Sequence, residues 1–146
     1  MSERNKALVR EMFAATEKGD VARLFELLDP DMVLTLAGTT PLSGRYEGGA
    51  AVADLTRRVR SLIDHVSLEV DELVGDGDIV VGFGRGAGVA KTGRPYNNTY
   101  VWRFRLVNDR IVEYTEFGDT ALVETALFGK DLVETGSDSP KVGAAS

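Results

Sequence analysis

Polar and aromatic side chains alternate along one short segment, and this is the first place where the sequence suggests chemistry. Asn98, Tyr100 and Trp102 stand at every second position, so in a β-strand they would share one face. A tyrosine hydroxyl can donate to a substrate oxygen, and an asparagine amide can fix a water or a carbonyl. The segment therefore predicts either a binding wall or ordinary core aromatics beside a hydrogen-bonded amide.

Asp119, in "EFGDTALV", is the candidate acid or base. A carboxylate in a dry cavity has a raised pKa and can exchange protons near neutral pH. The competing interpretation is a helix cap, because an Asp before Thr120 would accept backbone N–H groups. Glu116 lies nearby, but alternation away from Phe117 and Asp119 predicts that Glu116 faces solvent.

Arg85 is the candidate charged partner. We expect it on the same face as Tyr100, beside Phe83, where an unpaired guanidinium would be costly to bury. Asp119 or Glu113 would form an ion pair with this guanidinium. The alternative is an arginine at the rim of the face, with its head group in water.

Other chemistries have little to build on. The chain has no cysteine and one histidine, so a thiol nucleophile is excluded and we expect no metal site. That histidine, His65, is predicted to cap the end of a helix. The evenly spaced glycines of residues 82–88 match no phosphate-binding fingerprint, so we expect no nucleotide cofactor.

Composition limits the class of protein and its partners. The 146 residues, 43% of them hydrophobic, are the length of one ordinary domain. A net charge of −6 with dispersed basic residues argues against nucleic acid. The sequence has neither a signal-peptide pattern nor an apolar run long enough to span a bilayer, so we expect a cytoplasmic protein with no membrane partner.

Helical periodicity dominates the first half of the chain. It predicts a helix over residues 3–17, a short helix between an N-cap at Asp20 and a break at Pro30, and a helix over residues 49–64. A brief strand at residues 31–38 and a loop of about a dozen residues separate the second helix from the third.

Strand periodicity takes over after His65. It predicts an antiparallel meander with tight turns, whose strands cover residues 66–75, 78–90, 95–107 and 111–119. A short helix over 120–128 follows, so residues 1–130 form one domain and residues 131–146 a flexible tail. Helices before strands predict an α+β fold, in which helices cover one face of a curved, cone-shaped antiparallel sheet with a hollow inside.

The register of the central hairpin decides which residues face that hollow. If Thr92-Gly93 is a two-residue loop, the glycines lie on the outer face, where a second subunit would meet them. The concave face then carries these pairs: Ala87 with Asn98, Arg85 with Tyr100, and Phe83 with Trp102. A slip of one residue would place glycines opposite Tyr100 and Trp102 instead, and the rings would fill the gaps. Turn chemistry favours the first register.

Three stretches together resemble the SnoaL-like members of the nuclear transport factor 2 superfamily, which also contains ketosteroid isomerase, limonene epoxide hydrolase and scytalone dehydratase. They are "EKGDVARLFELLDPDMVL", "LSGRYEGGAAVADL" and "YNNTYVWRFRLVNDRIVEYTEFGDTALV". The resemblance covers the chain up to about Gly129. It implies a cystatin-like, nuclear transport factor 2-like α+β barrel with a deep apolar pocket, acid-base residues on the wall, and frequent dimers through the sheet.

The resemblance does not extend to the residues of ketosteroid isomerase. The positions of its tyrosine and its two aspartates fall on Met12, Leu36 and Trp102. Asp119 instead resembles the acidic residue that SnoaL-like and epoxide-opening relatives carry near the end of the last strand. An Arg85 pair with Asp119 would resemble the Asp-Arg-Asp geometry of the epoxide hydrolases, although the spacing differs.

The sequence therefore predicts cofactor-free acid-base chemistry: cyclisation, isomerisation, dehydration or epoxide opening. The substrate would be a small hydrophobic oxygenated molecule of the polyketide, terpenoid or steroid type. The alternative is a non-catalytic binding module or dimeric assembly module of the same fold. The expected catalytic residues are Asp119, Arg85 and Tyr100. The expected substrate-binding residues are Asn98, Trp102, Phe83, Phe117, Leu36 and Met12. We also expect a homodimer through the outer face of the sheet.

Overall fold

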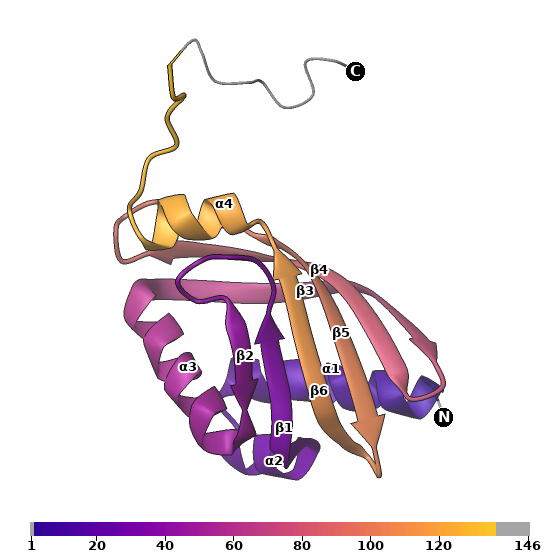
Figure 1. Cartoon of the computed structure of the whole chain (residues 1–146). Helices are drawn as coiled ribbons and strands as arrows, with labels where there is room; N and C mark the ends of the chain where they lie inside the picture. The colour runs from indigo at the N-terminus through magenta and orange to yellow at the C-terminus, as the bar shows by residue number, and fades with distance from the viewer. Residues whose placement is uncertain (1, 137–146) are drawn as a thin grey trace, which may run out of the picture.

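The structure is a computed structural model that describes residues 2–136. Helices and a single sheet form one α+β unit (Figure 1). In chain order they are α1 (Ser2–Lys18), α2 (Val21–Leu27), β1 (Leu28–Leu36), β2 (Gly44–Glu47), α3 (Gly48–Leu62), β3 (Ile63–Asp76), β4 (Ile79–Ala90), β5 (Thr99–Val107), β6 (Arg110–Gly118), α4 (Thr120–Leu122) and the π-helix η1 (Val123–Leu127).

The first two helices begin and end where the sequence predicts, with one difference. The Asp20 carboxylate accepts the backbone N–H of Arg23 at 3.1 Å, which confirms it as the N-cap of α2. The helix ends at Leu27, before Pro30, which lies inside β1. Proline cannot donate to a ladder, and pairing between β1 and β6 is irregular between Leu28 and Val33.

The sheet is larger than the predicted meander. Its six strands run in the order β2-β1-β6-β5-β4-β3. The antiparallel run from β3 to β6 is confirmed, but β1 pairs with β6 in parallel, and β2 forms inside the segment that was predicted to be a loop. The sheet is curved and not closed; α1 packs against β3 and β4, and α3 against β1 and β3 (Figure 1).

The favoured register of the β4–β5 hairpin is wrong, and the register slipped by one residue is correct. Gly82 pairs with Trp102, and Gly84 pairs with Tyr100. The loop has three residues, since the N–H of Ala90 donates to the carbonyl of Arg94 at 2.9 Å. Gly93 is the last residue of this loop and has a φ of +88°. A glycine with positive φ is typical of three-residue hairpin loops as well as of the two-residue loop that was expected.

The corrected register reverses the two faces of β4. Gly82, Gly84 and Gly86 are buried on the concave face, which corrects the prediction that they face outward. The rings of Tyr100 and Trp102 stack there with centroids 5.3 Å apart. A Cβ on Gly84 would lie 2.7 Å from the Trp102 ring, so the glycines make room for the aromatic pair.

A β-bulge reverses the expected faces of β6 as well. Leu106 pairs with Ile111 but Arg105 pairs with Glu113, which leaves Val112 as an extra residue. Beyond the bulge Trp102 pairs with Glu116, and paired residues share a face. The prediction that Glu116 faces solvent is therefore wrong.

The chain leaves the sheet through α4 and η1, at the end of β6 (Figure 1). Residues 128–136 form neither helix nor strand, and residues 137–146 of the predicted tail lie outside the described residues. Among residues 2–136, no helix has both the length and the hydropathy needed to cross a bilayer.

Candidate active site

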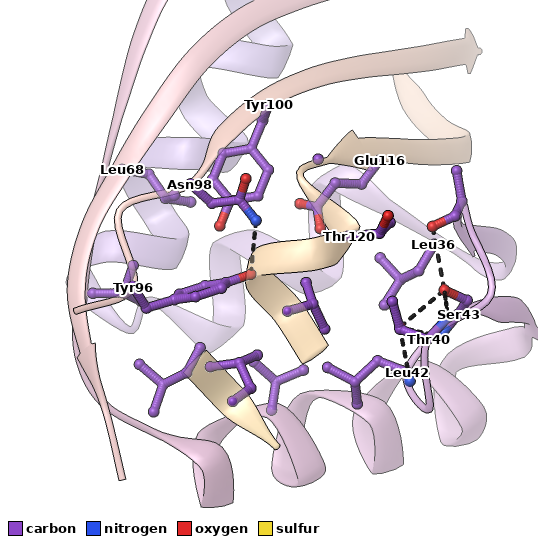
Figure 2. A pocket seen from close by; sticks show the side chains of 17 residues that line it. Leu36, Thr40, Leu42, Ser43, Leu68, Tyr96, Asn98, Tyr100, Glu116 and Thr120 are labelled. Atoms are coloured by element: carbon purple, nitrogen blue, oxygen red, sulfur yellow. Dashed lines mark hydrogen bonds between the residues drawn. The ribbon is translucent and has the colours of Figure 1, made fainter. Parts of the chain in front are cut away.

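A cavity of about 180 Å³ lies between the concave face of the sheet, α3 and the α4–η1 segment (Figure 2). Most of its wall is apolar. The main apolar side chains are Leu36, Leu42, Val59, Ile63, Leu68 and Leu127, and the polar ones are Thr40, Ser43, Tyr96, Asn98, Tyr100, Glu116 and Thr120. Val66 and Leu68 of β3, 39% and 36% exposed, connect this wall with the surface.

Glu116 is the only carboxylate among the described residues that line the cavity. Burial raises the pKa of its side chain above the ordinary value, and a hydrogen bond from Trp102 opposes that rise in part. The Trp102 indole N–H donates to Oε1 at 3.0 Å. Sequence reasoning missed Glu116 because the bulge in β6 was not recognised. One signal of the bulge was available. Ile111 and Tyr114 both pack in the core although they are three residues apart, which a regular strand does not allow.

Asn98 is buried and fully hydrogen-bonded. Its Oδ1 accepts the backbone N–H groups of Thr99 and Asp119, both at 2.8 Å. Its Nδ2 donates to the Tyr96 hydroxyl at 3.1 Å and to the Asp119 carbonyl at 3.3 Å. The prediction that a buried amide here must be bonded is confirmed. These four bonds fill the capacity of the amide, so Asn98 positions its neighbours and has no bond left for a guest molecule.

Two phenols stand beside this amide. Tyr96 and Tyr100 both line the cavity. Burial is the main cause that raises the pKa of each phenol, so both stay protonated at neutral pH. Tyr100 was predicted. Tyr96 was missed, because it lies in the irregular segment before β5 and the expected register gave it no role.

Thr40 and Ser43 form the polar end of the cavity, in the connection between β1 and β2. The Ser43 hydroxyl accepts the backbone N–H of Thr40 at 2.9 Å and donates to the Ala37 carbonyl at 3.2 Å. The two hydroxyls lie 3.0 Å apart. These bonds stabilise the loop next to the cavity. Sequence analysis did not identify Thr40 or Ser43 as site residues.

Asp119 lies at the edge of the site with its carboxylate turned away. Its Oδ1 accepts the N–H of Leu122 at 3.1 Å, which is the helix-cap geometry that was the competing interpretation. The side chain is exposed and is not part of the cavity wall. Only the backbone of Asp119 reaches the site, through Asn98.

Arg85 lies on the outer face, which corrects its predicted place on the concave wall. The one-residue shift in register turns its side chain outward, where it is 61% exposed. Its Nη2 lies 3.3 Å from carboxylate oxygens of Glu69 and Asp71. The expected pairs with Asp119 and Glu113 are not formed.

The remaining predicted residues divide between the core and the outer face. Leu36 lines the cavity next to Glu116, its partner across β1 and β6. Met12 and Trp102 are core residues, and Trp102 reaches the site through its N–H. Phe83 and Phe117 are 40% and 50% exposed on the outer face. They were expected to contact substrate, and they lie outside the cavity because the faces of β4 and β6 are the reverse of those predicted.

The described part of the chain, residues 2–136, offers no group of three or more metal-ligating side chains. What the site does offer is a carboxylate with a raised pKa beside two protonated phenols on an otherwise apolar wall. Such a combination can exchange a proton with a bound molecule while a neutral donor holds one of its oxygens.

Comparison with known proteins gives one family and many similar folds. The SnoaL-like domain model matches residues 9–114. A search of curated proteins found no match. Among solved structures, an NTF2-like protein of unknown function from Burkholderia pseudomallei is 28% identical, with a TM-score of 0.79 over 87% of this chain and 98% of its own.

Two further structures carry descriptions of activity. A putative isomerase from Bacillus subtilis is 25% identical, with a TM-score of 0.75 over 88% of this chain and 95% of its own. A putative SnoaL-like polyketide cyclase from Jannaschia sp. CCS1 is 18% identical, with a TM-score of 0.76 over 90% of this chain and 96% of its own. The second likeness concerns the fold alone.

Proposed function

Because the chain belongs to the SnoaL-like domain family, we propose that it catalyses cofactor-free proton transfer on a small, hydrophobic, oxygenated molecule, with Glu116 as the exchanging group. One observation carries the proposal. Glu116 is the single carboxylate among the described lining residues, and burial against an apolar wall raises its pKa. It replaces Asp119 in the role that the sequence suggested.

The surroundings of Glu116 suit this role. Trp102 donates to Oε1 and thereby fixes the orientation of the carboxylate, while Oε2 accepts no hydrogen bond from residues 2–136 and is available to a substrate. As a carboxylate, Glu116 takes a proton from a carbon next to a carbonyl; as an acid, it returns the proton to another carbon or to a leaving oxygen. The apolar wall keeps water away from the intermediate.

Among the reactions expected from the sequence, isomerisation, cyclisation and dehydration need only such a proton shuttle. The similar protein described as a putative isomerase supports this group of reactions. Epoxide opening was expected to use a pair between Arg85 and Asp119, and neither side chain lines the cavity. We therefore propose the proton-shuttle reactions and leave epoxide opening out.

Cavity size limits the substrate. A buried apolar cavity of about 150 Å³ is known to hold benzene. The 180 Å³ here suits one ring with a short substituent, or one ring of a larger molecule that extends past Val66 and Leu68. This supports a compact cyclic substrate or a terminal ring of a polyketide or terpenoid.

The test is hydrogen–deuterium exchange at the α-carbons of a panel of small cyclic ketones, followed by NMR in deuterated buffer. We expect Glu116→Gln to slow exchange by about 100-fold or more, in the range of lost general acid-base groups. The matched control is Glu113→Gln, the same change on the outer face of the same strand. Equal exchange by Glu116→Gln and the unaltered chain would reject the role of Glu116. Ketones that bind without exchange would instead support the binding-module alternative.

We also propose that two copies pair through the outer face of the sheet. Phe117, Val101 and Phe83 form one row across β6, β5 and β4, and both phenylalanines are at least 40% exposed. A contiguous patch of exposed apolar side chains is typical of a surface that another protein covers.

A further inference from the structure

The orientation of the Asn98 amide follows from its partners. Backbone N–H groups only donate, so the N–H groups of Thr99 and Asp119 must both bond to the amide oxygen. The amide nitrogen therefore points to the Tyr96 hydroxyl and donates to it. As a result, one lone pair of the Tyr96 oxygen is occupied by Asn98.

In this bond the Tyr96 hydroxyl is the acceptor, so its own proton is not used. The Tyr100 phenol lines the same cavity. Burial raises the pKa of both phenols, so both keep their protons at neutral pH.

No acceptor for the Tyr96 proton is found among the described residues, while the phenol itself lines the cavity. Figure 2 shows its ring extending into the cavity, with the hydroxyl toward Asn98 and the apolar side chains on the other side. The Tyr96 proton is therefore offered to whatever occupies the cavity.

The wall also restricts what that occupant can be. No lysine, arginine or histidine is among the described residues that line the cavity, so an anionic guest would be buried next to Glu116 without a counter-ion. A carbonyl brings only an acceptor, which is what the unused proton of Tyr96 requires.

We infer that the Tyr96 hydroxyl is the hydrogen-bond donor that holds a bound molecule by its carbonyl oxygen, and that the ligands of the cavity are compact neutral carbonyl compounds. Asn98 is the positioning residue that fixes the direction of the donor. The inference uses the cavity of the proposed function and names its ligand class, but it does not depend on proton transfer by Glu116.

The experiment compares two probes of the same shape, acetophenone and α-methylstyrene, which differ by a carbonyl oxygen in place of a methylene. Their affinities for the full chain are measured by titration calorimetry or ligand-detected NMR. We expect Tyr96→Phe to weaken acetophenone binding about tenfold, the usual effect of one lost neutral hydrogen bond, and to change α-methylstyrene binding less than twofold. Thermal unfolding verifies that the variant is folded.

Infrared spectra of carbonyl-labelled acetophenone give a second readout. The C=O stretch is expected at lower frequency in the unaltered chain than in Tyr96→Phe, because the hydrogen bond weakens the double bond. Tyr114→Phe is the matched control, since this buried phenol packs edge-on against Phe104 away from the cavity wall. It should leave both the affinity and the band unchanged.

The Tyr100 hydroxyl lines the same cavity and is the other available phenol donor, so the double variant Tyr96→Phe, Tyr100→Phe is measured as well. A loss that appears only in the double variant would overturn the assignment to Tyr96. Equal loss of both probes, binding of neither probe by the unaltered chain, or no loss in either variant would overturn it too. Glu116→Gln should keep the lowered C=O frequency and should not weaken acetophenone binding, so a failure of proton transfer is distinguishable from a failure of this inference.

Discussion

The Trp102 indole N–H donates to Glu116 Oε1 at 3.0 Å. A fully buried core side chain therefore holds the carboxylate that faces the cavity. The bond ties the chemistry of the site to the packing of the core, because Trp102 itself occupies the space left by the glycines of β4. Changes on either side of this bond have predictable effects.

Trp102→Phe removes the N–H and should raise the pKa of Glu116 further, because that hydrogen bond lowers it in the intact protein. If the carboxylate form is the active base, the rate falls as pH falls through its pKa, and in the variant this fall occurs at higher pH. The smaller ring also leaves a void, for which we expect a loss of about 2 kcal/mol in the free energy of unfolding. A pH–rate profile with an unmoved or lowered inflection contradicts the prediction.

Glu116→Gln should stabilise the fold at neutral pH. A carboxyl whose pKa is raised in the folded state favours folding fully below its unfolded pKa, and this contribution is lost as pH rises through the folded pKa. The neutral amide avoids that loss. Thermal unfolding from pH 4 to 8 should show the variant above the unaltered chain at high pH, with the difference vanishing at low pH.

The control for this titration is Glu113→Gln, for which the sign is opposite. Hydrogen bonds from Arg103 and Arg105 lower the pKa of Glu113, so its contribution to stability is present above the unfolded pKa and is lost as pH falls through the folded pKa. This variant should be less stable than the unaltered chain at neutral pH. If the two variants changed stability in the same direction as pH rises, the opposite pKa shifts of Glu116 and Glu113 would be contradicted.

Gly84→Ala should destabilise the protein by about 3 kcal/mol, because the added methyl meets the Trp102 ring at 2.7 Å and the Glu69 carbonyl at 2.3 Å. Urea denaturation measures this change. Gly49→Ala is the control, since its added methyl meets nothing closer than 3.8 Å in the first turn of α3. The control should be neutral or slightly stabilising. A well-tolerated Gly84→Ala would reject the register of the hairpin.

Asp119→Asn should retain both activity and stability, because asparagine caps a helix about as well as aspartate. Asp119→Ala should lose about 1 kcal/mol through the lost cap, with proton exchange unchanged. Ketone exchange and thermal unfolding report the two effects separately. A large loss of exchange in Asp119→Asn would return the catalytic role to the residue that the sequence suggested.

Phe117→Asp should convert a dimer into a folded monomer, because it replaces one of the two exposed phenylalanines of the row with a charge. Light scattering after size exclusion measures the mass, and circular dichroism the fold. Phe25→Asp is the control, since Phe25 is 77% exposed on α2, away from the sheet. An unaltered chain that is monomeric at micromolar concentration would contradict the proposed pairing.

The sequence predicted the elements well and the faces poorly. Helices, strands and the cap at Asp20 follow from periodicity and local chemistry, which neighbouring residues determine. The face of each strand depends on register, and one residue of error reverses it. The hairpin at Gly93 and the bulge at Val112 each introduce such a reversal.

These two reversals explain which site residues were found. Asn98 and Tyr100 were placed on the concave face by alternation within one strand, and that needed no knowledge of the partner strand. Arg85 was misplaced because it was assigned through pairing with β5. Glu116 was misplaced because it was assigned by alternation from Phe117 and Asp119, which were both expected on the concave face. Tyr96 was missed because it precedes the strand, and its direction is set by tertiary hydrogen bonds.

Direct titration of Glu116 by carbon-13 NMR of the side-chain carboxyl, with and without acetophenone, tests the account at its centre. The account predicts a pKa above the ordinary glutamate value in the free protein and a further rise when the ligand displaces water from the cavity. A carboxyl that titrates at its ordinary value and does not respond to the ligand would contradict it.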